Sequence, residues 1–271
     1  QAWWHQETGY VPITKSAYEL SKKQGFYEKN PGTDTAIKQL SLNIPTPNSR
    51  GLRFGNFVQI RDVINEEMEA VVQVAHNHRR KVYGHCRATQ GIKNALLAGF
   101  DSIEHGTFMD QECLDLMLER QVPCVPALQF EYASVQNGPD FDMPQDVVDG
   151  HQETLEGGAE SARMIHEAGG VLGMGGDYGF AWNPHGDYAK ELSFFTDYVG
   201  FSPMDTLVCA TRNGGQAMEP TGSLGTLQQG NRADFLVVSG DPLADIRILQ
   251  DRDQFTVFKG GQQASVRSGA N

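Results

Sequence analysis

Two short apolar runs that each end in a histidine limit the fold of this chain more than any other feature of its sequence. The first run covers residues 81–86 and carries His85, and the second covers residues 101–106 and carries His105. The stretch between them, 89–99, is rich in Ala and Leu and predicts a compact helix. Two strands joined by one crossover helix make a parallel βα unit, so both histidines are expected at the same edge of a sheet.

A third run of the same kind, residues 170–177, ends in the carboxylate of Asp177. Asp177 shares its parity with Val171, so both are expected on one face of the strand. Imidazole nitrogens and carboxylate oxygens are ligands that zinc takes in proteins, and the ends of successive parallel strands meet at one rim. The sequence therefore predicts a metal site made of His85, His105 and Asp177.

The spacing of the strands indicates repeated βα units. Strand starts near residues 57, 81, 101 and 122 follow one another at intervals of 20 to 24 residues, which is the period of βα units rather than of hairpins. We interpret the repeat as an α/β fold, a (β/α)8 barrel of TIM type that is incomplete at its N-terminus. A doubly wound open sheet gives the same local pattern. The sequence also predicts helices over 145–168, 190–199 and 205–216, and a loop over 129–144.

The chain divides into four parts by the character of its sequence. Residues 1–55 have little legible pattern, and residues 56–222 carry the βα units of the barrel. Short strands separated by turn residues indicate a small C-terminal β-sandwich portion over 223–263. Residues 264–271 are predicted to be a frayed tail.

Composition narrows the class of partner. The formal net charge of −12 argues against nucleic acid and anionic membranes, because both favour a basic face, and no apolar run approaches the roughly 18 residues of a membrane-spanning helix. The four cysteines form no CxxC pair, which favours reduced core thiols, and the sequence has no Asn-x-Ser/Thr sequon. We expect a cytoplasmic homo-oligomer that acts on a small molecule.

Several segments together resemble the amidohydrolase superfamily, in particular its imidazolonepropionase-like and Xaa-Pro dipeptidase-like members. They are the GH and IEHG pieces within 82–110, the GMGGD run that ends at Asp177, the HG-x-x-x-x-EL run over 185–192 and the GTLQQG-x-x-ADFLVVSGDPL run over 225–243. The resemblance covers about residues 56–262. It implies a (β/α)8 barrel with a β-sandwich, and hydrolysis by metal-activated water at a carbon bonded to nitrogen or oxygen.

The same resemblance assigns roles to three residues. It implies that His85 and His105 are metal ligands, and that Asp177 binds the metal and takes the proton from the attacking water. Neutral imidazoles suit zinc, and an open coordination position lowers the pKa of bound water to roughly 7. The implied substrate is an amide, such as a dipeptide, an N-acyl amino acid or a cyclic amide.

The chain departs from the family pattern in two places. Family members carry a His-x-His pair on the first barrel strand, whereas the only such pair here, His76 and His78, falls on a predicted helix, where residues two apart point in different directions. Binuclear members carry a Lys at the position of Gln59, and Gln cannot be carbamylated to bridge two metals. We therefore expect at most one zinc ion, and a chain that is a fragment or has lost its first strands.

The other candidate residues concern the substrate. Arg61 and Arg87 each follow a strand end by two residues, where a guanidinium can hold a carboxylate with two hydrogen bonds, although a surface ion pair is equally consistent with that position. Gln59, Tyr178 and His185 complete the predicted substrate-binding set. His185 lies in a loop and is equally consistent with a surface position.

Two alternatives to a metal-dependent amide hydrolase remain open. Mononuclear deaminases of the same superfamily would accommodate Gln59, but they usually carry a Glu three residues after the first of the two strand-end histidines, where this chain has Ala88. The second alternative is a non-catalytic remnant that serves as a binding or assembly subunit. Loss of the first-strand histidine pair favours it, and retention of His85, His105 and Asp177 opposes it.

Overall fold

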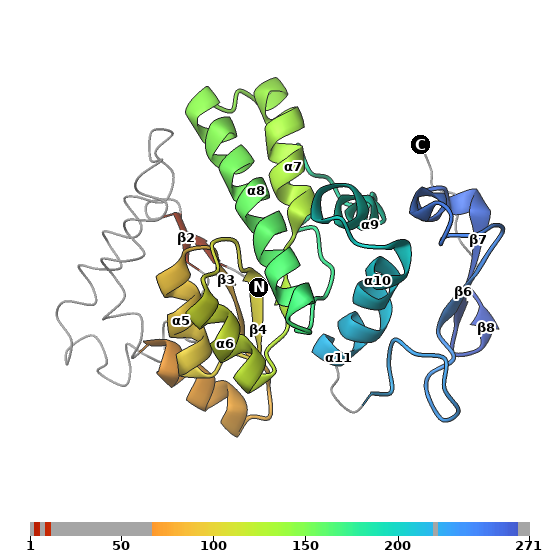
Figure 1. Cartoon of the computed structure of the whole chain (residues 1–271), viewed down its shortest axis with the longest axis horizontal. Helices are drawn as coiled ribbons and strands as arrows, with labels where there is room; N and C mark the ends of the chain where they lie inside the picture. The colour runs from red at the N-terminus through yellow and green to blue at the C-terminus, as the bar shows by residue number, and fades with distance from the viewer. Residues whose placement is uncertain (1–2, 6–8, 12–66, 219–221, 265–271) are drawn as a thin grey trace.

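The computed structural model describes residues 3–5, 9–11, 67–218 and 222–264. A small parallel sheet with its helices, a pair of long helices, a second group of helices and a C-terminal antiparallel sheet follow one another along the chain (Figure 1). The strand expected near residue 57 lies outside the described residues. So do two predicted substrate-binding residues, Gln59 and Arg61.

The parallel sheet places the two histidine-ending strands side by side. Its order is β3-β4-β5, with β3 at Tyr83–Cys86, β4 at Ser102–His105 and β5 at Cys124–Val125. Leu172 forms a parallel bridge to Cys124, so the segment leading to Asp177 runs beside β5. The predicted parallel βα order is confirmed, and the strands of the described residues do not close into a barrel.

Two helices of the predicted βα units pack on this sheet. They are α5 (Thr89–Ala98) and α6 (Gln111–Arg120), which lie side by side in Figure 1. The chain leaves α5 at Gly99 with φ 95°, a left-handed conformation that glycine adopts without the steric cost of a Cβ. α6 begins after Asp110, whose carboxylate accepts a hydrogen bond from the backbone N–H of Cys113.

The segment after β5 differs from the loop predicted over 129–144. Helix α7 covers Leu128–Asn137, and a 3-10 turn at Gly138–Phe141 follows it. The Gly, Pro and Asp residues that signal a loop are confined to the second half of this segment. The first half is buried on most sides, so it has no polar face to mark it as an amphipathic helix.

The remaining helical predictions are confirmed with changes at the ends. α8 (Gln145–Glu167) packs against α7, and the two stand together at the top of Figure 1. Two of the later helices each continue into a π-helical turn. The elements are α9 (Lys190–Phe194) with the turn Phe195–Val199, and α10 (Pro203–Val208) with the turn Cys209–Asn213, which leads into α11 (Gly214–Met218).

The C-terminal part forms an antiparallel sheet where short strands were predicted. Its antiparallel sheet has the order β6-β7-β8, with β6 at Phe235–Val238, β7 at Phe255–Lys259 and β8 at Gln262–Gln263. The guanidinium of Arg247 donates to both carboxylate oxygens of Asp197, at 2.8 and 2.6 Å, and so ties this part to the end of α9. Near the other end of the chain, the backbone of β1 (Trp3–His5) pairs antiparallel with β2 (Gly9–Val11).

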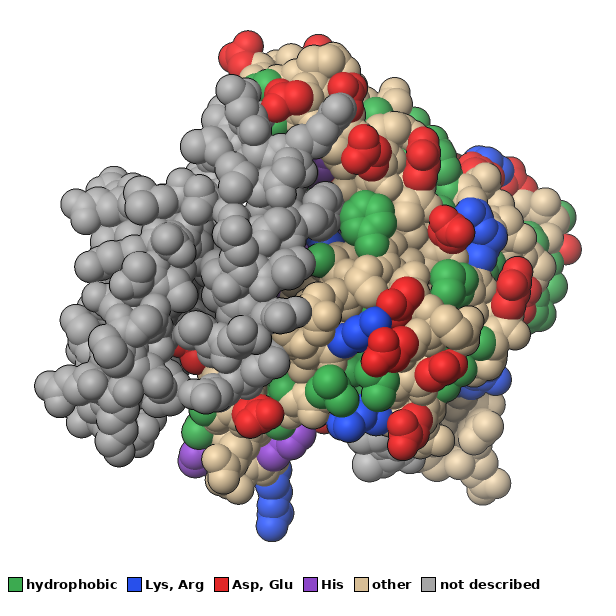
Figure 2. Space-filling model, turned by 60° about the vertical axis from the view of Figure 1, so that its left-hand side comes forward, with side chains coloured by type: hydrophobic (Ala, Val, Ile, Leu, Met, Phe, Trp, Pro, Cys, Tyr) green, Lys and Arg blue, Asp and Glu red, His purple; other side chains and the backbone are tan. Residues whose placement is uncertain are grey.

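The charges on the surface and the composition of the described helices follow the net charge and the hydropathy of the sequence. Acidic side chains are spread over the described part of the face in Figure 2, with fewer Lys and Arg among them. None of the helices in the described part of the chain combines the length and the apolar composition needed to cross a bilayer. The four cysteines are buried and free, at the core positions that the sequence predicts.

The core between the parallel sheet and its helices provides a test of the packing. Leu96 on α5 is fully buried, whereas its neighbour Leu97 is 57% exposed. We expect Leu96→Ala to lower the free energy of unfolding by about 2 to 5 kcal/mol, because it removes buried methyl groups and leaves a cavity. The matched variant Leu97→Ala should cost less than about 1 kcal/mol. Urea denaturation of both variants measures the difference, and equal costs would contradict the assignment of the buried face.

Candidate metal centre

The structure brings together the three residues that the sequence singles out as metal ligands. Nδ1 of His85 lies 2.8 Å from Nε2 of His105, and Oδ2 of Asp177 lies 3.7 Å from the same His105 nitrogen. One ligand atom from each residue lies within 4.8 Å of the others. Three segments that are far apart in the sequence therefore place their polar ends at one point.

Sheet register alone does not explain this convergence. In the β3-β4 pair, His85 is opposite Glu104 and Cys86 is opposite His105, so regular alternation would point the two imidazoles to opposite faces. His105 instead has φ 71° at the last position of β4, and Asp177 has φ 46°. Such left-handed conformations are uncommon for residues other than glycine and cluster at functional sites.

Both imidazoles are held in the neutral form at neutral pH. His105 is 1% exposed, and burial together with the nearby charge of Arg87 lowers its pKa well below the ordinary value. Burial also lowers the pKa of His85, with Asp177 acting in the opposite direction. Neutral imidazoles have the free lone pair that a metal ion needs.

A buried network adjoins the same nitrogen of His105 that His85 contacts. The guanidinium of Arg87 donates through Nη1 to Oε1 of Glu131, while its Nη2 lies 3.3 Å from Nε2 of His105. Nδ1 of His151 lies 2.6 Å from the other oxygen of Glu131. Burial alone would raise the pKa of Glu131, but the charge of Arg87 and the contact with His151 lower it below the ordinary value. Glu131 is therefore an ionised carboxylate in the core.

The chemistry of this donor set fits one divalent ion. Ligand atoms bound at about 2.0 Å to one ion lie roughly 3 to 4 Å from one another, and the distances from His105 to His85 and to Asp177 are 2.8 and 3.7 Å. Two neutral imidazoles and a carboxylate are a common zinc set and leave a coordination position open. The single lone pair of His105 at Nε2 faces this space, because a guanidinium can only donate and so assigns the proton of the ring to Nδ1.

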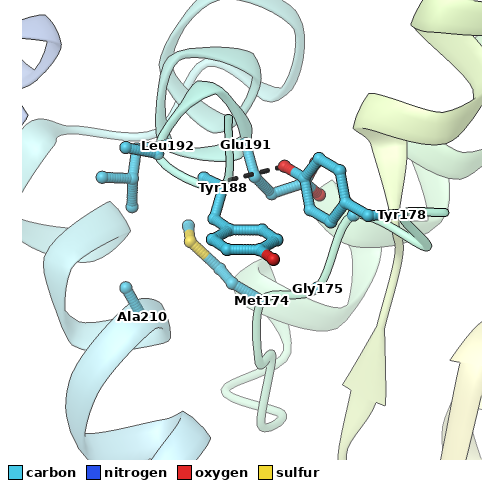
Figure 3. A pocket seen from close by; sticks show the side chains of 9 residues that line it. Met174, Gly175, Tyr178, Tyr188, Glu191, Leu192 and Ala210 are labelled. Carbon is cyan, nitrogen blue, oxygen red and sulfur yellow. Dashed lines mark hydrogen bonds between the residues drawn. The ribbon is translucent and has the colours of Figure 1, made fainter. Parts of the chain in front are cut away.

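A cavity of about 430 Å³ lies next to the segment that ends at Asp177. Met174, Gly176 and Tyr178 line it, and Figure 3 shows the ring of Tyr188 beside that of Tyr178. The hydroxyl of Tyr178 is 3.3 Å from the carbonyl oxygen of Tyr188, and burial raises the pKa of Tyr178. Asp177 and the two histidines are not among the lining residues, but Gly176 and Tyr178, the chain neighbours of Asp177, are.

The other residues considered in the sequence lie in different places. Arg87 adjoins the centre, but it is engaged with Glu131 rather than free on the surface. His185 lies in the loop beyond Asp177, where its Nδ1 is 3.3 Å from the hydroxyl of Tyr188, which lines the cavity. His76 pairs with Asp101 at 2.9 Å at the end of a helix over 67–77.

Two buried residues of this network, Glu131 and His151, were not among the candidates predicted from the sequence. Glu131 lies in α7, where a loop was predicted, so no helical face was available on which to place it. His151 had a usable signal, because it follows Val148 by three residues and precedes Leu155 by four, on the apolar stripe of α8. A histidine on such a stripe is buried and needs a polar partner, which is Glu131 here.

The parallel βα units, the C-terminal sheet and the convergence of two histidines with an aspartate define an amidohydrolase-type chain. The sequence profile of the amidohydrolase family matches residues 59–264, so the chain belongs to this family.

Solved structures show the same relation. A Xaa-Pro dipeptidase with bound methionine is 30% identical, with a TM-score of 0.65 over 74% of this chain and 49% of that chain. A protein from Bifidobacterium longum described as a prolidase is 27% identical, with a TM-score of 0.70 over 76% of this chain and 52% of that one. Ochratoxinase from A. niger is 26% identical, with a TM-score of 0.65 over 73% and 45% of the two chains. This chain spans about half the length of these structures, and they support a TIM-barrel-type α/β fold.

A short part of the chain is also similar in sequence to proteins of another kind. Over 68 residues, 25% of this chain, the sequence is 59% identical to the sn-glycerol-3-phosphate-binding periplasmic protein UgpB of Escherichia coli (strain K12). The same length in the Yersinia pestis protein, bv. Antiqua (strain Antiqua), is 60% identical. The chain spans only 16% of those proteins. A match of this extent carries no function to the whole chain.

Glu191, a second buried carboxylate, gives a pH-dependent prediction. Its two oxygens accept hydrogen bonds from the N–H groups of Leu128 and Gln129 at the start of α7, at 3.0 and 2.7 Å. Complete burial nevertheless raises its pKa to about 8. The folded state therefore binds a proton more tightly than the unfolded state, so this contribution to stability is complete below about pH 4.5 and is lost as the pH rises to about 8.

We expect the unfolding free energy of the native chain to fall by roughly 1 kcal/mol per pH unit across this window through Glu191 alone. The side chain of Glu191→Gln cannot ionise. The unfolding free energy of this variant should therefore fall less steeply between pH 5 and pH 8, and the two slopes should differ by roughly 1 kcal/mol per pH unit. Thermal or urea unfolding of both proteins across this range gives the comparison. Parallel pH profiles would contradict the proton uptake assigned to Glu191.

Proposed function

We propose that this chain is a metal-dependent hydrolase of amide-type C–N bonds, with one zinc ion held by His85, His105 and Asp177. The observation that carries the proposal is the convergence of these three side chains within 4.8 Å. Membership in the amidohydrolase family supports the reaction class, and similarity to a Xaa-Pro dipeptidase supports a dipeptide substrate. The proposed barrel unit covers 56–222 and the proposed β-sandwich portion covers 223–263.

The residues of the site suit different parts of such a reaction. A bound zinc ion supplies Lewis acidity and lowers the pKa of a water molecule. Asp177 is 30% exposed at its side chain, so the carboxylate oxygen that does not hold the ion would be accessible to accept the proton of the attacking water. Burial of His105 keeps water from that side of the site, and the charge of Arg87 favours an anionic group of the substrate nearby.

Metal binding is tested first. We expect about one zinc per chain after removal of loosely held metal, because three donors converge at one site. His105→Asn should lose this ion, because the shorter side chain removes Nε2 as a donor. His76→Asn is the matched control, since it makes the same replacement at an imidazole that pairs with Asp101. Metal analysis of dialysed protein measures both, and a native chain without zinc would favour the non-catalytic alternative.

The reaction is tested with Xaa-Pro dipeptides, N-acyl amino acids and cyclic amides, using zinc-loaded chain. We expect metal-dependent release of the amine product, and Asp177→Asn should lower kcat by about a hundredfold or more because it removes the proton acceptor. Asp187→Asn, which changes an exposed carboxylate in the next loop, is the control and should keep kcat. Product release that is unchanged in Asp177→Asn would refute the assigned role.

A further inference from the structure

The positive charge of Arg87 lies next to the candidate metal centre, where it would repel a metal cation. Its Nη2 lies 3.3 Å from Nε2 of His105, the same nitrogen that faces Asp177 and His85. A fixed positive charge at this distance opposes the approach of a divalent cation. The charge also stays at every accessible pH, because an arginine side chain is not deprotonated in proteins.

Glu131 supplies the opposite charge from inside the core. Its side chain is 2% exposed, and the Nη1 group of Arg87 donates to Oε1. Its second oxygen is taken by Nδ1 of His151 at 2.6 Å, and the side chain of His151 is 7% exposed. A guanidinium can only donate hydrogen bonds and an ionised carboxylate can only accept them. Glu131 therefore accepts from both Arg87 and His151.

We propose that Glu131 and His151 form a buried positioning pair, which holds the guanidinium of Arg87 beside Nε2 of His105 and compensates its charge next to the metal centre. The proposal rests on the proposed metal site for its effect on zinc. Its structural part, the fixed position of Arg87, does not require a metal.

Three features of the network support a positioning role over a purely stabilising ion pair. The two donors of Glu131 come from different elements, Arg87 just after β3 and His151 on α8, so the carboxylate fixes their relative positions. Arg87 uses two different nitrogens, one for Glu131 and one for His105, which fixes the plane of the guanidinium. The ring of Phe130 lies 5.6 Å from the centre of the guanidinium and limits its movement.

The arrangement fits a substrate with an anionic group. Once an ion occupies Nε2 of His105, that nitrogen no longer accepts from Arg87. The Nη2 group then has a free donor next to the metal centre, while Nη1 remains bound to Glu131. A carboxylate of a dipeptide or N-acyl amino acid offers the acceptor that such a fixed guanidinium recognises.

The first measurement uses metal-free protein and reports on Arg87 directly. We expect the side-chain nitrogen NMR signals of Arg87, assigned with Arg87→Lys, to show restricted rotation of the guanidinium in the native chain. Glu131→Gln should lose this restriction, because the neutral amide offers a weaker acceptor in place of the carboxylate. Freely rotating Arg87 in the native chain, or unchanged restriction in Glu131→Gln, would overturn the positioning role whether or not the chain binds zinc.

The second measurement is zinc affinity, from competition with a chromophoric chelator. Glu131→Gln should weaken zinc binding by about tenfold or more, since it leaves the Arg87 charge uncompensated beside the ion. The double variant Arg87→Gln with Glu131→Gln removes the charge as well, and it should bind zinc within about threefold of the native chain. A merely structural Glu131 predicts the reverse, a double variant at least as weak as the single one, and that result would overturn the charge compensation.

Three further variants separate effects on the Glu131 network from general effects on the fold. His151→Leu should loosen Arg87 as Glu131→Gln does, and His151→Asn should retain the position of Arg87 because its amide still donates to Glu131. Glu156→Gln changes an exposed carboxylate on the same helix and should leave both measurements unchanged. If the native chain binds no zinc, the hydrolase proposal fails, and the NMR result still decides the positioning pair.

Discussion

The burial of His105 at the end of a parallel strand is the constraint on which the candidate centre depends. Burial lowers the pKa of His105, so its imidazole is neutral and its free nitrogen accepts from a donor or binds a cation. The left-handed backbone at His105 turns this nitrogen toward His85 and Asp177, against the alternation that the sheet register would impose. The left-handed conformation of His105 costs backbone energy, and it is also what brings the His105 nitrogen to the other two residues of the site.

The buried carboxylates connect the rest of the fold to this point. Glu191, on α9, accepts from the first N–H groups of α7, where Ala127 has no side chain that could cap the helix. α7 in turn carries Glu131, which contacts Arg87 beside His105. The position of α9, in the second half of the chain, therefore influences the charge beside His105. A shift of α7 would move the compensating carboxylate.

The parts that could be predicted from sequence are those governed by local pattern. Strands that end in polar residues, with helices between them, gave the parallel order of β3 and β4 and the convergence of His85, His105 and Asp177. Helix α7 could not be predicted, because it is buried on most sides and its hydrophobic residues show no period. Glu131 was missed with it, since a buried charge is recognised only when its partners, which come from two other elements, are known.

The same network has a consequence for substrate preference. A cation near an open metal position raises the local concentration of anionic groups and disfavours cationic ones. Because Glu131 is almost fully buried and Arg87 remains a quarter exposed at its side chain, the compensation acts from the core side and leaves part of the guanidinium facing outward. An amide substrate with a carboxylate next to the scissile bond would satisfy this exposed donor, whereas a neutral cyclic amide would leave it unpaired. Under the proposed hydrolase function, this exposed donor is the reason to expect an N-acyl amino acid or a dipeptide as substrate rather than a neutral amide.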